Sequence, residues 1–181
     1  MADSARWERL LAPVSADAPC GADLEYDPAF IALQAAATGK PEQQFGDKII
    51  PGEEPDWRVV GSEAAALLER TKDLRVAALL LRSETRTAGI AGFVQALRWL
   101  EALMRQYWPS LHPALDADDG DDPTMRVSAL QTLADGSMLV ADFREALVAT
   151  VRGIGPLRVR DIENAMNAGQ GRASEQSLTQ E

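Results

Sequence analysis

The densest group of side chains that could bind a metal ion is a run of five aspartates within seven residues. These are Asp116, Asp118, Asp119, Asp121 and Asp122. An EF-hand loop has glycine at position 6 and glutamate at position 12, but Gly120 as position 6 places Leu115 at position 1 and Arg126 at position 12. The favoured interpretation is a solvated loop whose last aspartate caps a helix starting at Pro123. The alternative is a divalent-metal-dependent hydrolase that uses these carboxylates.

Other catalytic arrangements lack the residues they require. His112 is the single histidine and lies between two prolines in Trp108-Pro-Ser-Leu-His-Pro113. Cys20 is the single cysteine, so there is no intrachain disulfide and no ordinary zinc site. The sequence has no Walker motif, no G-x-G-x-x-G and no G-x-S-x-G. We interpret His112 as a structural residue of its turn and expect no catalytic residue, metal or cofactor.

The charge and hydropathy of the chain limit its partners. The 28 acidic and 18 basic residues give a net charge of −10, which repels nucleic-acid phosphates and anionic lipid headgroups. The longest purely apolar run, residues 76–81, is far shorter than the roughly 20 residues that span a bilayer. The N-terminus does not have the basic and then apolar pattern of a secretory signal. We therefore expect a cytoplasmic protein that neither binds nucleic acid nor inserts into a membrane.

The elements that would position these residues are predicted to be helices. Ala, Leu, Glu and Arg are abundant, and no stretch of five residues or more alternates between apolar and polar side chains. Helix starts are predicted at Asp27-Pro28, Asp56 and Asp73, where an aspartate can cap the first turn. The prediction is an all-α fold: a single irregular helical bundle of about seven to eight helices with long loops.

The strongest predicted helix covers residues 88–108. Its apolar side chains form one stripe, namely Ile90, Phe93, Val94, Leu97, Leu100, Met104 and Trp108. A further helix is predicted from Gly136-Ser137 to the glycines near residue 153. We expect the core to contain Leu79, Leu80, Phe93, Leu97, Leu100 and Leu130.

Two features have no evident structural role in this bundle. Trp99 lies about 180° from the apolar stripe, so it either makes a second contact inside the domain or belongs to a partner surface. Residues 39–55 contain three glycines and three prolines and form a long loop, which is a common location of functional residues. The loop either packs back through Phe45 or presents a recognition surface. The candidate partner-binding residues are Lys40, Glu42, Gln43, Gln44, Phe45 and Trp99.

Seven strings between residues 11 and 126 resemble, in the same order, the N-terminal domain of the ImpA/TssA family of bacterial type VI secretion systems. They are Leu11-Ala-Pro-Val-Ser-Ala-Asp-Ala-Pro-Cys-Gly21, Tyr26-Asp-Pro28, Gly39-Lys-Pro-Glu-Gln-Gln-Phe-Gly-Asp47, Glu54-Pro-Asp-Trp57, Thr71-Lys-Asp-Leu-Arg75, Tyr107-Trp-Pro-Ser-Leu-His-Pro113 and Asp122-Pro-Thr-Met-Arg126. The resemblance extends over roughly residues 10–165.

The resemblance implies a non-enzymatic protein–protein interaction domain that helps assemble or couple the baseplate, the membrane complex and the contractile tail. Its partners would be other type VI components: the baseplate, the tail tube or sheath, and the membrane complex. Family members usually continue into a ring-forming C-terminal domain. Here we expect residues 1–167 to form the helical domain, residues 168–181 to be a disordered polar tail, and the isolated chain to be a monomer or weak dimer.

Overall fold

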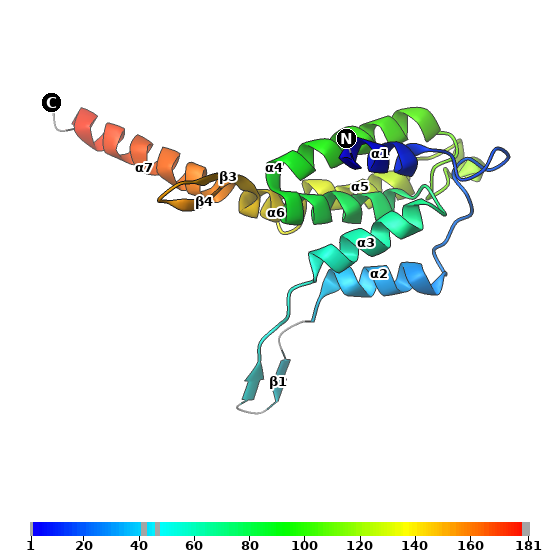
Figure 1. Ribbon diagram of the computed structural model, residues 1–181, viewed down its shortest axis with the longest axis horizontal. Coiled ribbons are helices and arrows are strands. Elements are labelled where there is room, and N and C mark those ends of the chain that lie inside the picture. Colours follow the sequence, from blue (N-terminus) through cyan, green and yellow to red (C-terminus); the bar gives the residue numbers. More distant parts are fainter. Residues whose placement is uncertain (1, 41–42, 46–47, 179–181) are drawn as a thin grey trace.

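The computed structural model describes residues 2–40, 43–45 and 48–178 (Figure 1). Its helices are α1 (Ala2–Leu11), α2 (Pro28–Thr38), α3 (Trp57–Leu68), α4 (Leu74–Tyr107), the short 3-10 helix η1 (Ala117–Asp119), α5 (Thr124–Ala134), α6 (Leu139–Glu145) and α7 (Val159–Leu178). Its strands are β1 (Gln43–Phe45), β2 (Lys48–Ile50), β3 (Leu147–Val151) and β4 (Gly155–Arg158). No helix in this part of the chain is long and apolar enough to cross a membrane.

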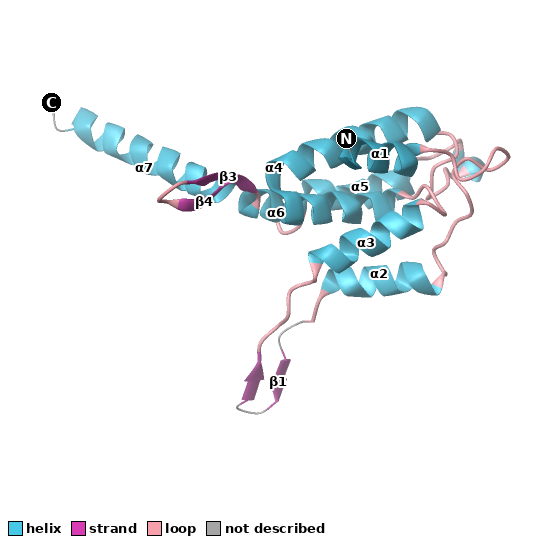
Figure 2. Cartoon of the chain, in the orientation of Figure 1, coloured by secondary structure: helices cyan, strands magenta, loops and turns pink. Residues whose placement is uncertain are grey.

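The chain is mostly helical, as predicted, but two antiparallel hairpins, β1–β2 and β3–β4, correct the all-α prediction (Figure 2). The predicted helix from Gly136-Ser137 stops at Glu145, and β3 follows it. All five residues of β3 are exposed, and its sequence, Leu-Val-Ala-Thr-Val, lacks the alternation of apolar and polar residues that marks a half-buried strand. The predicted count of seven to eight helices is not confirmed, because it depends on how the break inside α4 is treated.

Three of the predicted helix starts, at Asp27, Asp56 and Asp73, are confirmed by capping bonds, whereas α6 begins at Leu139 rather than at Gly136-Ser137 and has no side-chain cap. The Asp27 side chain accepts a hydrogen bond from the backbone N–H of Ala29, with Pro28 in the first turn. Asp56 caps α3 and Asp73 caps α4 in the same way. These bonds join residues two or three positions apart, so the local sequence is enough to predict them.

Helix α4 joins two helices that the sequence predicts separately. Its backbone leaves the helical region at Gly89, with φ 66° and ψ −149°, and the two halves fold back against each other (Figure 1). This conformation is essentially restricted to glycine. The halves approach closely at Gly92 too, because a Cβ there would lie 2.4 Å from the carbonyl oxygen of Glu84.

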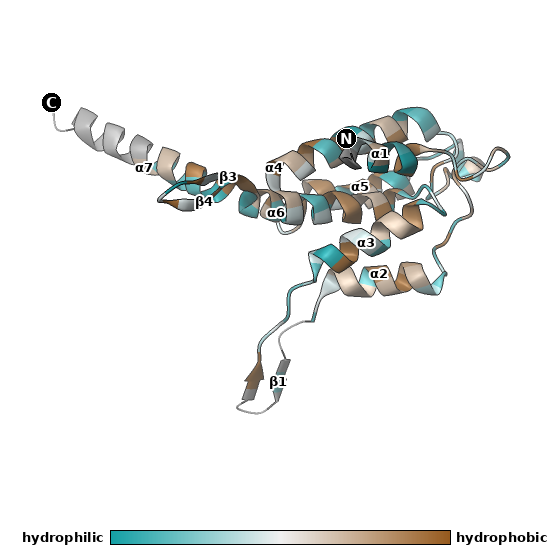
Figure 3. Cartoon of the chain, in the orientation of Figure 1, coloured by the Kyte–Doolittle hydropathy of each residue, from teal (hydrophilic) through white to brown (hydrophobic). Residues whose placement is uncertain are grey.

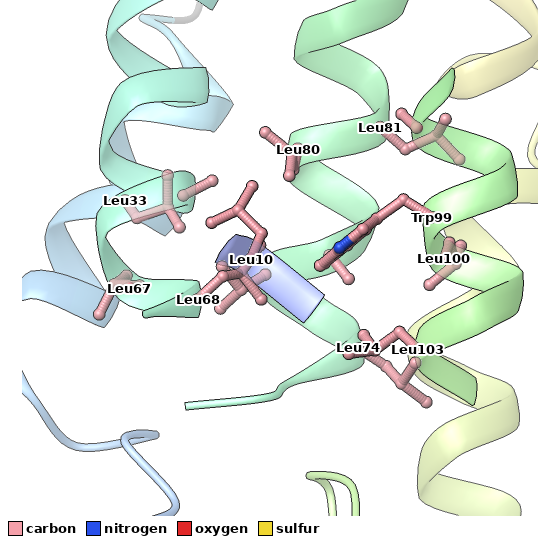
Figure 4. Packing of buried hydrophobic residues seen from close by; sticks show 14 of the residues in the cluster. Leu10, Leu33, Leu67, Leu68, Leu74, Leu80, Leu81, Trp99, Leu100 and Leu103 are labelled. Atoms are coloured by element: carbon pink, nitrogen blue, oxygen red, sulfur yellow. The ribbon is translucent and has the colours of Figure 1, made fainter. Parts of the chain in front are cut away.

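The core lies between α1, α3 and the two halves of α4 (Figure 4). Leu80 and Leu100 are buried, as predicted, whereas Leu79, Phe93 and Leu130 are partly buried and pack against the core. The prediction for Leu97 is wrong, because 43% of this residue is exposed. The second half of α4 packs through a neighbouring face that includes Gly92, Ala96, Trp99 and Leu103. Hydrophobic periodicity does not select this face, because glycine and alanine contribute little to it.

The two hairpins extend from different sides of the helical body. The β1–β2 hairpin projects beyond the ends of α2 and α3, while β3–β4 and α7 extend from α6 (Figure 1). Helix α7 includes most of the segment predicted to be a disordered tail, and residues 179–181 lie outside the described residues. The division into residues 1–167 and 168–181 stays a prediction.

Candidate functional site

The acidic loop is closed by its own backbone. The N–H of Asp116 donates to the carbonyl oxygen of Asp122 at 3.1 Å, and the Asp116 side chain accepts from the N–H of Asp118 at 3.1 Å. The Asp122 carboxylate accepts from the N–H of Thr124 at 3.3 Å. Because α5 begins at Thr124 with Pro123 at its N-cap, Asp122 lies one position before the cap that the sequence predicts for it. Among the described residues, no group of three or more His, Cys, Asp or Glu side chains is arranged to hold a metal ion. Nothing in the loop supports the hydrolase alternative.

Trp99 is part of the core. It is 5% exposed, and its ring centroid lies 5.8 Å from that of Trp7. Figure 4 shows its indole pointing between the helices toward Leu10. Of the two interpretations of Trp99, the contact inside the domain is therefore the one that the structure supports. Trp99 is not available as an exposed anchor for a partner.

In the other candidate surface, residues 39–55, the described strands β1 and β2 pair with each other beyond a bonded base. Lys40 and Glu53 exchange two backbone hydrogen bonds of 2.9 Å, and their side chains form an ion pair of 2.6 Å. Gly39 has φ 67°, and a Cβ there would lie 2.5 Å from the carbonyl oxygen of Glu53. The base of the hairpin is thus held where α2 ends.

The far part of this hairpin exposes apolar side chains. Gln43 pairs with Ile50 and Gln44 with Ile49, and both isoleucines are exposed, with β2 coloured as hydrophobic in Figure 3. Successive side chains of a strand point to opposite faces, so each face of the ribbon carries an exposed isoleucine.

Of the residues predicted for partner binding, Lys40 lies at the base of the hairpin and Gln44 is an exposed residue of β1. Glu42, and the side chains of Gln43 and Phe45, lie outside what the structure describes. Ile49 and Ile50 are not among the residues that the sequence predicts for partner binding. The available signal was the Gly-Asp pair at residues 46–47 between two short segments, which is a hairpin pattern.

Four of the strings that resemble the family meet at one end of the bundle. They are residues 11–21, 71–75, 107–113 and, through Arg126, 122–126. The N–H of Lys72 donates to the carbonyl oxygen of Cys20 at 2.8 Å, and the N–H of His112 donates to that of Lys72 at 3.0 Å. His112 Nε2 lies 3.1 Å from the carbonyl oxygen of Gly21, and Cys20 Sγ lies 3.2 Å from the hydroxyl oxygen of Ser110. His112 therefore has the structural role that the sequence predicts.

Two buried cations hold this junction together. Lys72 Nζ donates to the carbonyl oxygens of Leu10 and Leu68 at 2.8 and 2.7 Å, and burial lowers the pKa of Lys72. Arg126 is fully buried, and burial lowers its pKa as well. A buried cation is tolerated only where it has hydrogen-bond partners. These bonds are therefore needed to keep the two cations buried at the junction.

Arg126 binds the turn that follows α4. Its guanidinium donates to the carbonyl oxygens of Pro113 at 2.8 Å, of Leu111 at 2.5 Å and of Trp108, and it lies 4.8 Å from the Trp108 ring centroid. The sequence does not predict that Lys72 and Arg126 are buried, because charged residues are rarely fully buried. The junction fixes the course of the loops at this end of the bundle.

Residues 11–135 match the family model for ImpA, N-terminal, type VI secretion system. The chain belongs to this family. Type VI secretion system component TssA1 of Pseudomonas aeruginosa is a relative of this ImpA N-terminal domain, with 44% identity over 172 residues, which cover 95% of the chain and 49% of the relative.

A solved structure has the same fold as this ImpA N-terminal domain. It is the N-terminal domain, including the ImpA_N region, of the TssA component of the type VI secretion system from Burkholderia cenocepacia. The TM-score is 0.68 at 28% identity, over 94% of this chain and 62% of that one. The chain thus spans about half the length of the curated relative and less than two thirds of the solved one.

Proposed function

We propose that this ImpA N-terminal domain is a non-enzymatic, cytoplasmic interaction module, which binds other type VI components and helps to assemble or couple the baseplate, the membrane complex and the contractile tail. The observation that carries the proposal is the β1–β2 hairpin, which presents exposed Ile49 and Ile50 beyond a base bonded by Lys40 and Glu53. The partner-binding residues we propose are Lys40, Glu42, Gln43, Gln44 and Phe45, with Ile49 and Ile50 added.

Energetic and geometric features of the hairpin support this role. A two-stranded ribbon by itself is only marginally stable in water. A partner that covers this ribbon removes apolar surface from water, and this burial stabilises the complex. The outer edges of β1 and β2 are not paired with another described strand, and such edges can accept a further strand.

The test is a pull-down with purified baseplate, tail and membrane-complex components as separate preys. Replacing both isoleucines, Ile49→Ser with Ile50→Ser, is expected to weaken capture of the partner about tenfold or more, which corresponds to about 1.4 kcal/mol. Ile154→Ser is the matched control, because Ile154 is exposed on the other hairpin. If the double variant captures every component as the wild type does, the hairpin is not the binding surface.

We further propose that the isolated chain is a monomer or weak dimer. The described part of α4, the longest helix, buries one face inside the domain and carries a break at Gly89, so it is not a continuous coiled-coil seam. Light scattering at micromolar concentration is expected to give the mass of one or two chains. A stable assembly of six or more chains would contradict this.

A further inference from the structure

The backbone of β3 carries hydrogen-bonding groups that the β3–β4 hairpin does not use. Thr150 pairs with Pro156 in this antiparallel ladder. In such a ladder, pairs that exchange two N–H···O bonds alternate with pairs whose N–H and C=O groups point away from the partner strand. Pro156 has no N–H, so its pair with Thr150 is not one that exchanges two bonds. The N–H and C=O groups of Thr150 therefore point outward from the hairpin.

The other end of β3 agrees with this alternation. The N–H of Val159 donates to the carbonyl oxygen of Ala146 at 3.2 Å, so the next residue, Leu147, faces outward. Its carbonyl oxygen lies against α4, because a Cβ at Gly89 would be 2.3 Å from it. Helix α4 thus covers the outer edge of β3 at Leu147. Among the described residues, no group outside the hairpin bonds to the backbone of Thr150.

The opposite edge of the hairpin, on β4, is closed. Pro156 is the residue of β4 that faces outward beside Thr150, and it has no N–H to offer to a further strand. Helix α7 also packs against β4. A further strand can therefore extend this hairpin only along β3.

The side chains of β3 do not protect its open edge. Strand edges that stay in solvent usually carry charged side chains, lysine above all. All five residues of β3 are exposed and none is charged, and Figure 3 shows the strand as largely hydrophobic. A bulge separates Leu147 from Ala149 near α4, but residues 149–151 pair with β4 in regular register. This regular part is open to pairing.

A cation lies directly after this open edge. Arg152 is exposed and has no ion-pair partner among the described residues. The neighbouring arginines are paired, namely Arg144 with Glu163, and Arg158 and Arg160 with Glu145. A carboxylate brought beside the end of β3 therefore meets a cation without a competing partner. Charge complementarity of this kind contributes to specificity more than to affinity.

We propose that the outer edge of β3 binds an extended segment of another protein, which adds to the hairpin as a third, antiparallel strand. The segment exchanges two N–H···O bonds with Thr150 and carries an acidic side chain opposite Arg152, two positions before its bonded residue. An extended segment is the occupant because the edge offers unpaired N–H and C=O groups. A helix has already bonded its own backbone groups and cannot use them.

A second copy of this chain fits the edge less well. If Thr150 of two copies paired symmetrically, Val148 of one copy would lie opposite Arg152 of the other. Residues 147–152 contain no carboxylate, so neither cation would gain a partner. Two chains of net charge −10 also repel each other. The occupant is therefore a strand of a different protein.

The probe is a displayed library of linear peptides of about ten residues, selected on the full 181-residue chain. Peptides that also bind the variant Thr150→Pro are removed, because this substitution deletes an outward N–H that β4 does not use. Fluorescence anisotropy is then expected to show at least tenfold weaker binding of the selected peptides to Thr150→Pro than to the wild type. Circular dichroism checks that the variant keeps its melting temperature. If it does not, the two measurements below decide without it.

A scan of the selected peptide by backbone N-methylation tests strand addition without changing the protein. Only every second N–H of an added strand faces β3. Methylation at alternate residues is therefore expected to weaken binding at least tenfold, and methylation at the residues between them is expected to leave it unchanged. Equal sensitivity at all positions, or at none, would contradict an added strand.

The charge at the end of the edge is tested by exchange. Arg152→Glu is expected to weaken binding of the acidic peptide severalfold, and lysine in place of the acidic residue of the peptide is expected to restore it. Ile154→Ser is the matched control, because Ile154 is exposed in the turn beyond the edge. The double variant Ile49→Ser with Ile50→Ser is expected to bind the peptide as the wild type does, so this site and the proposed partner surface fail or hold independently.

Three further results would overturn the proposal. They are a selection in which no peptide survives the removal step with a folded Thr150→Pro variant, binding that is insensitive to Arg152→Glu, and a dimer in light scattering that Thr150→Pro converts to a monomer. The last result would assign the edge of β3 to a second copy of the chain.

Discussion

A Cβ built on Gly89 would lie 2.3 Å from the carbonyl oxygen of Leu147. The break in α4 therefore packs directly against the backbone of β3, 58 positions later in the chain. No side chain fits between them, and the backbone conformation at Gly89 is one that other residues rarely adopt. This contact connects the helical body to the β3–β4 hairpin.

Replacing Gly89 by alanine is expected to destabilise the domain by at least about 2 kcal/mol, since the substitution adds backbone strain to a steric clash. Urea denaturation followed by circular dichroism measures the change. Gly136→Ala is the control, because a Cβ at Gly136 has no atom within 4 Å. Equal stability of the two variants would show that α4 and β3 are not packed at this distance.

Arg126→Leu is expected to cost roughly 3 kcal/mol or more, because the carbonyl oxygens of Trp108, Leu111 and Pro113 lose their donor. Arg126→Lys is expected to recover only part of this, since an ammonium lacks the planar fork of a guanidinium. Thermal denaturation compares these variants with Met125→Ala, at an adjacent exposed position. A loss below about 0.5 kcal/mol for Arg126→Leu would be the size of an ordinary surface substitution and would contradict the buried role.

The pH dependence of stability is expected to carry a contribution from Lys72. Burial lowers its pKa from 10.5, so in the pH range between the folded pKa and 10.5 the unfolded chain binds more protons than the folded chain. The contribution of Lys72 to the free energy of unfolding therefore rises as the pH rises through this range.

Denaturation of the wild type and of Lys72→Met at a series of pH values isolates this contribution. Burial also raises the pKa of Tyr107, which lowers stability above about pH 10, but this effect is present in both proteins and cancels in the difference. The difference in unfolding free energy, wild type minus variant, is expected to increase toward pH 10.5. A flat or falling difference would show that Lys72 is not desolvated in the folded state.

Leu97 and Leu100 form a matched pair on α4. Leu100→Ala is expected to cost about 2–5 kcal/mol, because Leu100 is buried in the core. Leu97→Ala is expected to cost less than about 1 kcal/mol, because its side chain remains partly in water in the folded protein. Chemical denaturation of both variants measures the two costs, and a larger cost for Leu97 would reverse the assignment of the buried face.

The hairpin was only partly accessible to sequence reasoning. The glycines and prolines of residues 39–55 identified a segment without a place in the helical bundle. They did not indicate that Ile49 and Ile50 are exposed, because an apolar pair is normally assigned to a core. Exposure here follows from the projection of the hairpin beyond α2 and α3, which is a property of the whole fold.

The sequence by itself determined the starts of α2, α3 and α4 and the family of the chain. A cap such as Asp27 acts on residues two or three positions away, and the strings that resemble the family are contiguous, so no knowledge of distant contacts is needed. The tertiary structure alone decided that α4 buries Trp99 rather than Leu97, and that Lys72 and Arg126 are buried cations. Burial depends on which segments pack together, and such contacts join residues far apart in the chain, as Trp7 and Trp99 do.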